Sequence, residues 1–486
     1  MRQLIYIILV ITLLASFGCA VNPVTGQQDL VLMSEQDEIA LGRKSHQQVL
    51  QQYGVYDDPE LQSYVQKVGE RLAANSHRNN LIYRFTVLDS KEVNAFALPG
   101  GYIYITRGLM SYLNSEAELA AVVGHEIGHV TARHSVRQYS AAQLANIGAT
   151  LGAILIPGMN SAGNQLVQIF GTALLRGYGR EHELEADQLG AEYLARTDYN
   201  PQAMLDVIRV LKNQELFETQ AARAEGREPN IYHGLFSTHP DSDARLQEVI
   251  AHADKYRNTP SNFIGREIYM DKMNGLVFGD SPEQGIVRGR NFYHEKLGFA
   301  MQMPHGWNIM NHPDRLAISA PNGVALMQLG MEDINERISP REFMETRLGL
   351  QHLTNDAPLN IHGSDAHTGL APVNTSDGKR TWRFTVIYFN NQAYILVGVA
   401  KDPGGTAEFD SYFLETAQSF HAITSNERIL AKPLRLKTIE VGSDTTFAAL
   451  AQSSPLETYS EEKLRLLNGM FPNGEPQAGM LLKVVE

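Results

Sequence analysis

The pattern of hydrophobic and polar positions divides the chain into a mainly helical first half and a strand-rich second half. In Ser34–Ser76 apolar residues recur at helical spacing with a break at Tyr53–Pro59, which predicts two amphipathic helices. Tyr83–Leu88 and Gly101–Thr106 alternate apolar and polar residues, as strands do. After residues 258–262 strand-like runs dominate, so we predict an α+β domain with an antiparallel sheet.

A further helix is predicted for Ser115–Arg137, where alanine, leucine and valine recur at helical spacing without a proline. Ser115 and Glu118 form a capping-box pattern that marks the start of this helix. The helix contains the sequence His-Glu-Ile-Gly-His. Positions four apart lie one above the other on a helix, so His125 and His129 point the same way and can bind one metal ion.

The residue between these histidines completes the pattern of a zinc hydrolase. Glu126 lies about 100° further round the helix, where its carboxylate can reach a water on the metal and act as a base. The alternative is a solvated helix face with two histidines, but the small and apolar neighbours favour a helix buried in a cleft. His134 falls about 140° from the ligand face of a continuous helix, so we predict a surface histidine.

A third ligand is needed, and the downstream candidates cluster in Arg180–Asp187. The third histidine of the metzincin pattern is absent. Among the acidic residues of this helical segment, Glu183 and Asp187 are four apart and share a face. A glutamate ligand supported by an aspartate that orients a ligand histidine, or that serves as an acid, is chemically sensible.

The motifs HEIGH and REHELEAD together resemble those of the HtpX, BepA and Oma-type metallopeptidases, peptidase family 48. The stretches NPVTG, MSEQDEIALG and NAFALPGG resemble the exported bacterial branch of that family. The resemblance covers roughly the first half of the chain. It implies a mainly helical, zincin-like catalytic domain with a small β edge and one Zn²⁺ ion. The implied residues are His125, His129 and Glu183 as zinc ligands, with Asp187 as the acidic residue four positions on.

The stretch before the second predicted strand is a candidate substrate-binding edge. In zinc peptidases of this general plan, a strand beside the metal helix pairs with an extended substrate. We therefore predict that Asn94, Ala95, Phe96 and Ala97 form this edge. An ordinary hairpin is an equally good interpretation of the same residues.

Two further segments of the catalytic half invite a functional interpretation. Gln138–Leu175 contains no charged residue; a proline and glycines cut it into pieces too short to span a bilayer, so we favour a lid over a membrane hairpin. In Leu235–Arg245, the family resemblance makes His239 a candidate latch for the open metal position and Arg245 a candidate to stabilise the oxyanion. The alternative is a capped turn before the next helix.

The N-terminus predicts export. Met1–Gly18 has one early positive charge and a short apolar run, as in a secretory signal peptide. Cys19 stands where cleavage would expose it, and the preceding residues resemble a bacterial lipobox in which Ser16 replaces the usual leucine. We expect lipidation of Cys19 and sorting to the outer membrane; the alternative is ordinary cleavage with a free thiol. Cys19 is the only cysteine, so no intramolecular disulfide can form.

The tail, Leu436–Val485, predicts a strand, two helices and a strand, and it loosely resembles a LysM module. This resemblance implies binding of peptidoglycan, and a folded cap without glycan binding is an equally good interpretation. We find no 34-residue repeat in the second half and interpret its α+β domain as a docking or positioning module.

The predicted architecture is therefore multidomain, with a mainly α catalytic domain, an α+β domain and a small βααβ tail. The predicted boundaries are a signal peptide at 1–18, an N-terminal linker at 19–33, a zinc metallopeptidase domain at 34–258, a linker at 259–289, an α+β accessory domain at 290–425 and a LysM-like domain at 433–486.

Charge and resemblance together define the expected function. A net charge of -13 without a basic patch argues against nucleic acid as a partner. The resemblance implies a metalloendopeptidase of the bacterial periplasm that acts on misfolded or misassembled envelope proteins. The alternative is a chaperone, or a peptidoglycan-anchored assembly factor, in which cleavage is incidental.

Overall fold

The computed structural model describes residues 19–141, 178–229, 262–312, 315–375, 378–402 and 404–486. The predicted signal peptide, nearly all of the predicted lid and the segment with His239 and Arg245 lie outside these residues. The chain forms two compact units. Unit 1 comprises Met1–Leu50, Gly54–Phe278 and Arg435–Glu486, and unit 2 comprises Gln51–Tyr53 and Gly279–Leu434.

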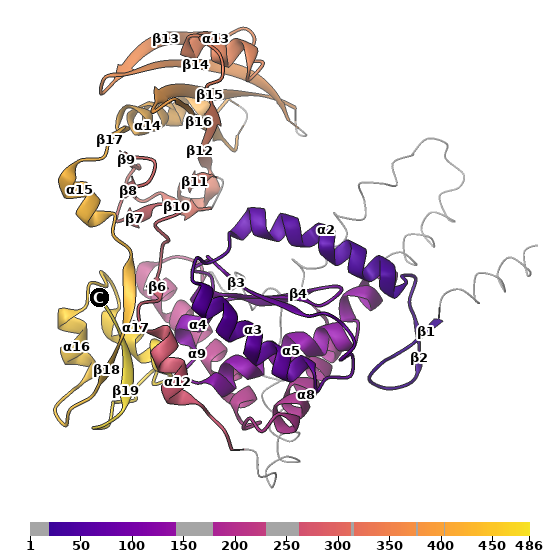
Figure 1. Ribbon diagram of the computed structural model, residues 1–486. Coiled ribbons are helices and arrows are strands. Elements are labelled where there is room, and N and C mark those ends of the chain that lie inside the picture. Colours follow the sequence, from indigo (N-terminus) through magenta and orange to yellow (C-terminus); the bar gives the residue numbers. More distant parts are fainter. Residues whose placement is uncertain (1–18, 142–177, 230–261, 313–314, 376–377, 403) are drawn as a thin grey trace, which may run out of the picture. The chain divides into compact units, whose positions relative to one another are not determined.

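The first two described helices of unit 1 are separated at the predicted break (Figure 1). Helix α2 covers Glu35–Tyr53, and α3 covers Pro59–Ala73. The side chains of Ser34 and Asp58 accept hydrogen bonds from backbone amides in the first turns of these helices. Pro59 is the first residue of α3, a position whose backbone amide would have no partner within the helix. The two-helix prediction is therefore confirmed, with the capping residues as its physical cause.

A three-stranded sheet follows, made of β3 (Arg84–Leu88), β4 (Ala95–Leu98) and β5 (Tyr102–Thr106). β5 is central; β3 runs parallel to it and β4 antiparallel. The tight turn between β4 and β5 depends on Gly101, because a Cβ there would lie 2.8 Å from the carbonyl oxygen of Ile82 and the backbone φ is +89°. The turn leaves β4 at one edge of the described sheet.

The helices that follow the sheet include the central helix of unit 1. Every residue of α5 (Glu116–Thr131) is buried, and α5 packs against α8 (Arg180–Arg196). Glycines allow this close approach: a Cβ on Gly128 would lie 2.9 Å from the carbonyl oxygen of Ala186. The other described helices of unit 1 before its tail are α4 (Arg107–Tyr112), α9 (Ala203–Glu225) and α12 (Arg266–Met273).

The start of α5 is capped nearly as the sequence predicts. The side chain of Ser115 accepts a hydrogen bond from the amide of Glu118 at 3.1 Å. The carboxylate of Glu118 accepts from the amide of Asn114, rather than from that of Ser115 as in a strict capping box. Both groups still satisfy amide donors at the buried helix start.

The tail has the predicted order of elements. It contains β18 (Leu434–Glu440), α16 (Phe447–Ser453), α17 (Ser460–Leu467) and β19 (Leu481–Val485). β18 pairs antiparallel with β19 and also hydrogen-bonds to β6 (Val277–Phe278), giving a sheet of order β19-β18-β6. The tail thus shares a sheet with β6, the last strand of unit 1 before residue 279.

Unit 2 has the antiparallel sheet that the sequence predicts. Seven strands lie in the order β10-β11-β12-β16-β15-β14-β13, and four more in the order β17-β9-β8-β7. Its strands are β7 (Ile286–Arg288), β8 (Asn291–His294), β9 (Phe299–Gln302), β10 (Asn308–Asn311), β11 (Leu316–Ser319), β12 (Ala325–Asp333), β13 (Thr354–Ile361), β14 (Ser364–Thr375), β15 (Gly378–Phe389), β16 (Gln392–Ala400) and β17 (His421–Ala422). Its helices are α13 (Pro340–Thr346), α14 (Thr406–Gln418) and α15 (Ser425–Leu430).

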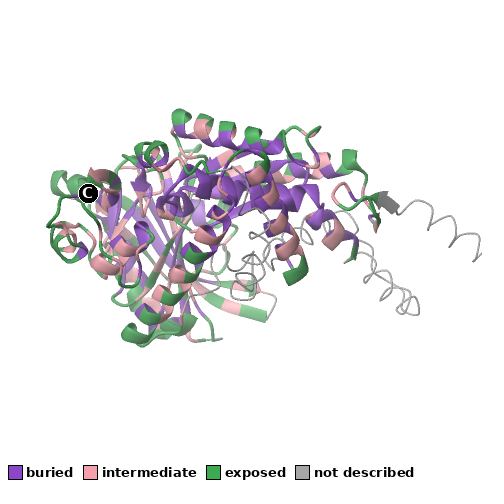
Figure 2. Cartoon of the chain, turned by 90° about the horizontal axis from the view of Figure 1, so that it is seen from below, coloured by how far each residue is buried: buried purple, intermediate pink, exposed green. Residues whose placement is uncertain are grey.

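Each unit has its own core, and buried residues, purple in Figure 2, run through both. The largest cluster of unit 2 joins the two sheets to α14 through residues such as Phe299, Met327 and Phe413. Among the described residues, no helix has both the length and the apolar composition to cross a membrane.

Candidate metal centre

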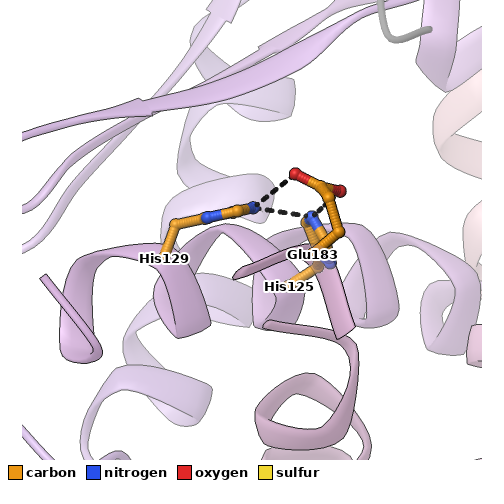
Figure 3. Close-up of side chains that lie close together, drawn as sticks. All are labelled: His125, His129 and Glu183. Carbon is orange, nitrogen blue, oxygen red and sulfur yellow. Dashed lines mark hydrogen bonds and ion pairs between the residues drawn. The ribbon is translucent and has the colours of Figure 1, made fainter. Parts of the chain in front are cut away.

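Three buried side chains converge between α5 and α8 (Figure 3). His125 and His129 stand one turn apart on α5, with their Nε2 atoms 3.0 Å from each other. Glu183 reaches them from the first turn of α8: its Oε1 lies 3.5 Å from Nε2 of His129, and its Oε2 lies 3.7 Å from Nε2 of His125. The structure therefore brings together the three residues that the sequence suggested as ligands.

The donor set suits zinc. Nitrogen binds Zn²⁺ at about 2.0–2.1 Å, and tetrahedral geometry then separates the ligand atoms by about 3.3–3.5 Å. The three separations here, 3.0, 3.5 and 3.7 Å, bracket that value. In the described part of the chain this is the one group of three or more such side chains arranged to hold a metal ion.

Asp187 lies behind His125, one turn along α8 from Glu183. Its Oδ1 is 2.8 Å from Nδ1 of His125, and the carboxylate is fully buried. An imidazole that donates its Nδ1 proton to a carboxylate keeps the lone pair of Nε2 for a metal. Of the two roles considered for Asp187, this position fits the orientation of a ligand histidine.

Glu126 and Tyr178 line the same region. The carboxylate of Glu126 belongs to a side chain that is only 1% exposed. The ring of Tyr178 stacks on that of His129, with centroids 4.1 Å apart. Burial, followed by the negative charges of Glu126 and Glu183, raises the pKa of Tyr178. The residue next to His125 on α5 is thus a buried carboxylate.

The prediction that His134 lies on the surface is wrong. His134 is fully buried, and its Nδ1 lies 2.8 Å from Nδ1 of His129. The prediction assumed a continuous helix, whereas α5 ends at Thr131 and the backbone turns at Arg133, whose φ is +55°. This left-handed residue turns the chain so that His134 meets His129.

The other nitrogen of His134 meets Glu185, which the sequence analysis did not single out. Nε2 of His134 is 3.0 Å from Oε2 of Glu185, and the same oxygen accepts from Arg137 at 3.0 Å. Burial lowers the pKa of His134. Burial alone would raise the pKa of Glu185, but hydrogen bonds and charge from His134 and Arg137 lower it to about 2. Glu185 is therefore an ionised carboxylate that can accept a hydrogen bond from Nε2 of His134.

The predicted substrate edge lies beside the metal helix. Asn94 precedes β4, and Ala95, Phe96 and Ala97 belong to β4, which packs against α5. Among the described strands, β4 pairs with β5 alone, so it is an edge strand. The position agrees with the prediction, and substrate binding there stays a prediction.

Three further predicted functional positions stay predictions. His239 and Arg245 lie outside the described residues. Cys19 begins β1 (Cys19–Val21), which pairs antiparallel with β2 (Gln28–Leu30). The backbone pairing says nothing of lipidation, which stays a prediction.

Comparison with known proteins gives this geometry a context. Residues 59–253, which contain all three metal-binding side chains, match Peptidase family M48. The "Metalloprotease YcaL" of Escherichia coli (strain K12) is 30% identical over 190 residues, which cover 38% of this chain and 69% of YcaL. The "Beta-barrel assembly-enhancing protease" of the same organism is 32% identical over 210 residues, covering 41% of this chain and 40% of the relative. The "Mitochondrial metalloendopeptidase OMA1" of Arabidopsis thaliana is 34% identical over 149 residues, covering 30% and 29%.

Two histidines one turn apart on a buried helix, completed by a glutamate from a second helix, define a metallopeptidase centre. The chain belongs to peptidase family M48, as its match to that family and its coverage of YcaL show. It spans less than half the length of the beta-barrel assembly-enhancing proteases that it matches.

Proposed function

We propose that this protein is a zinc-dependent endopeptidase of the bacterial cell envelope. The observation that carries the proposal is the convergence of His125, His129 and Glu183, with Asp187 hydrogen-bonded to the first of them. A structural zinc site is closed by four protein ligands, whereas a catalytic site has three and leaves one position for water or substrate. Among the described residues three buried side chains form the ligand group, and the buried carboxylate of Glu126, which is not one of them, is next to His125 on α5; this arrangement fits the catalytic type.

The protein side chains have separate roles in this reaction. Bound zinc supplies a Lewis acid that activates water and polarises the scissile carbonyl. Glu126 takes a proton from the attacking water and returns it to the amine of the departing peptide. β4 aligns the extended substrate through backbone hydrogen bonds, from the edge of the sheet beside α5. From the family resemblance, Arg245 stabilises the developing oxyanion and His239 acts as a latch.

The substrates that we propose are misfolded or misassembled envelope proteins. The support is the name of the Escherichia coli relative, a "Beta-barrel assembly-enhancing protease", together with the predicted signal peptide and lipidated Cys19. These features support a periplasmic location with a lipid anchor in the outer membrane. Absence of any envelope defect after loss of the gene would contradict this role.

The test is the substitution Glu126→Gln, which removes the base and leaves the three ligands in place. We expect unchanged zinc content and a loss of casein cleavage by about 10²–10⁴-fold, as for removal of a general base. Glu181→Gln is the matched control, because Glu181 is an exposed carboxylate on the ligand helix α8. Purified wild type without zinc, still inactive after zinc is supplied, would refute the proposal.

The name of the same relative also supports a second candidate, an assembly factor in which cleavage is incidental. The Glu126→Gln variant separates the two in cells. An endopeptidase loses its cellular function with this substitution, and an assembly factor keeps it. The readout is complementation of the envelope defect of a strain that lacks the gene, at matched protein levels.

A further inference from the structure

The two histidine ligands are supported in different ways. Nδ1 of His125 meets a carboxylate directly, that of Asp187, at 2.8 Å. Nδ1 of His129 instead faces Nδ1 of His134, also at 2.8 Å. The carboxylate of Glu185 lies on the far side of His134, with its Oε2 3.0 Å from Nε2 of His134.

The positions of the protons in this row follow from simple chemistry. A metal at the centre needs the lone pair of Nε2 of His129, so the proton of that ring must be on Nδ1. Two ring nitrogens at 2.8 Å need one donor and one acceptor, so Nδ1 of His134 accepts. The proton of His134 is then on Nε2, which donates to Glu185. One arrangement of protons satisfies every contact.

The surroundings hold this row in place. His134 is fully buried, and the ring of His182 stacks on it with centroids 4.3 Å apart and planes 20° from parallel. Tyr178 stacks on His129 at the same inclination. At its outer end, Glu185 is fixed by Arg137, whose Nε lies 3.6 Å from Oδ2 of Asp29. A half-turn of either ring would lose its hydrogen bond, and a smaller rotation would also disturb the stacking contact.

We propose that His134 is a positioning residue for the metal ligand His129, and that Glu185 fixes the tautomer of both rings through it. Asp187 accepts a hydrogen bond from His125 and so fixes its tautomer directly. Glu185 fixes the tautomer of His129 indirectly, through the imidazole of His134. The inference rests on the proposed function, because it needs a metal ion at the centre. It adds two residues that touch neither the metal nor the substrate and that control how tightly the ion is held.

The test compares side chains of similar size with and without an acceptor. His134→Asn keeps an oxygen near the position of Nδ1, whereas His134→Leu removes it. We expect His134→Leu to weaken zinc binding by about 10–100-fold, the usual effect of losing a partner of a ligand histidine, and His134→Asn to restore most of the affinity. The Kd is measured by competition with a chromophoric chelator, and the visible spectrum of the Co²⁺-substituted protein reports the ligand geometry.

A second pair tests the outer residue, which is easier to change because its side chain is 25% exposed. Glu185→Gln keeps an acceptor and Glu185→Leu does not, so we expect only the leucine variant to weaken zinc binding severalfold. His46→Leu is the matched control: His46, on α2, also bonds through Nδ1, but to the hydroxyl of Tyr104 at 2.6 Å rather than to a histidine ligand. Its zinc affinity should equal that of wild type.

The outcomes separate this inference from the function on which it rests. Wild-type zinc affinity in His134→Leu overturns the inference and leaves the peptidase proposal intact. Equal weakening in His134→Leu and His134→Asn also overturns it, because packing rather than the hydrogen bond would then matter. Wild type that takes up no zinc overturns the proposed function, and the inference with it. Thermal unfolding of each variant shows whether the fold is kept.

Discussion

At the scale of single residues, His294 makes the stability of unit 2 depend on pH. It ends β8, is 8% exposed and lies beside the rings of Phe292 and Phe299. Burial lowers the pKa of His294 to about 4; nearby Glu283 opposes the shift and Lys296 adds to it. Between pH 6.5 and about 4 the unfolded chain therefore binds a proton that the folded unit does not. In that window the free energy of unfolding therefore decreases by about 1.4 kcal/mol for each unit by which the pH is lowered.

We predict that His294→Leu removes this part of the pH dependence. Between pH 7 and pH 5 wild-type unit 2 should lose about 2 kcal/mol more stability than the variant. Both tryptophans, Trp307 and Trp382, belong to unit 2, so urea unfolding followed by tryptophan fluorescence reports that unit alone. The exposed His305 provides the control substitution, His305→Asn. Parallel pH profiles of wild type and His294→Leu would contradict the prediction.

The site could be predicted only as far as local geometry reaches. The spacing of His125 and His129 orients both side chains wherever the helix lies, so the sequence sufficed for these two residues. Glu183 was one of two acidic candidates until the family resemblance separated them. His134 was misplaced because a left-handed residue, Arg133, breaks the helical periodicity on which the angle was calculated. No periodic pattern encodes such a turn.

At the scale of elements, the last strand supports the start of the metal helix. Lys483 on β19 is fully buried, and its Nζ donates to the carbonyl oxygens of Ser111 and Leu113, both at 2.6 Å. These oxygens lie at the end of α4, where a helix leaves carbonyls without helical partners. Burial lowers the pKa of Lys483 well below its ordinary value, although the charge of Glu118 opposes this.

We predict that Lys483→Met destabilises unit 1 by about 2–4 kcal/mol, since each buried carbonyl left without a donor costs about 1–3 kcal/mol. Lys437→Met on β18 is the matched control: this side chain is 53% exposed, and its loss should change stability by less than about 0.5 kcal/mol. Thermal unfolding followed by far-ultraviolet circular dichroism measures both. Equal melting temperatures for the two variants would count against the support that we assign to β19.

The tail illustrates what an element pattern can and cannot predict. Its order of strand, helix, helix and strand was predicted, because alternation and capping act within a few residues. Its contact with α4 was not, because Lys483 and Ser111 are 372 positions apart and no local pattern connects them. That the tail binds peptidoglycan stays a prediction, and a pull-down of the wild type on purified peptidoglycan tests it.

At the scale of the whole molecule, residues 279–434, which are all of unit 2 except Gln51–Tyr53, interrupt the chain of unit 1 between segments that share one sheet. The chain leaves unit 1 after Phe278 and returns at Arg435. These two ends are adjacent: the amide of Gly275 donates to the carbonyl of Leu436 at 2.7 Å, and the amide of Leu436 donates to that of Leu276 at 2.8 Å. The tail follows the strand-rich segment along the chain, and this order alone predicts a third domain. Order along the chain does not reveal that the flanking segments pair.

This adjacency predicts that unit 2 can be removed without unfolding unit 1. We would replace residues 279–434 by a Gly/Ser linker of about six residues, a length that ordinary loops span. The described hydrophobic clusters of residues 279–434 consist of residues of that segment, so it has a core of its own. The shortened chain should bind one zinc ion and cleave casein in a Glu126-dependent manner.

The control for this excision is a chain that also lacks Arg435–Glu486. It loses β18 and β19 together with the buried contacts of Lys483, and we expect it to be insoluble or to melt at a much lower temperature. Zinc content and thermal unfolding of both shortened chains are the measurements. If the chain without unit 2 failed as completely as the control, unit 2 would be part of the folding unit of the peptidase. If both shortened chains folded and bound zinc, β19 would not be needed to hold the start of α5.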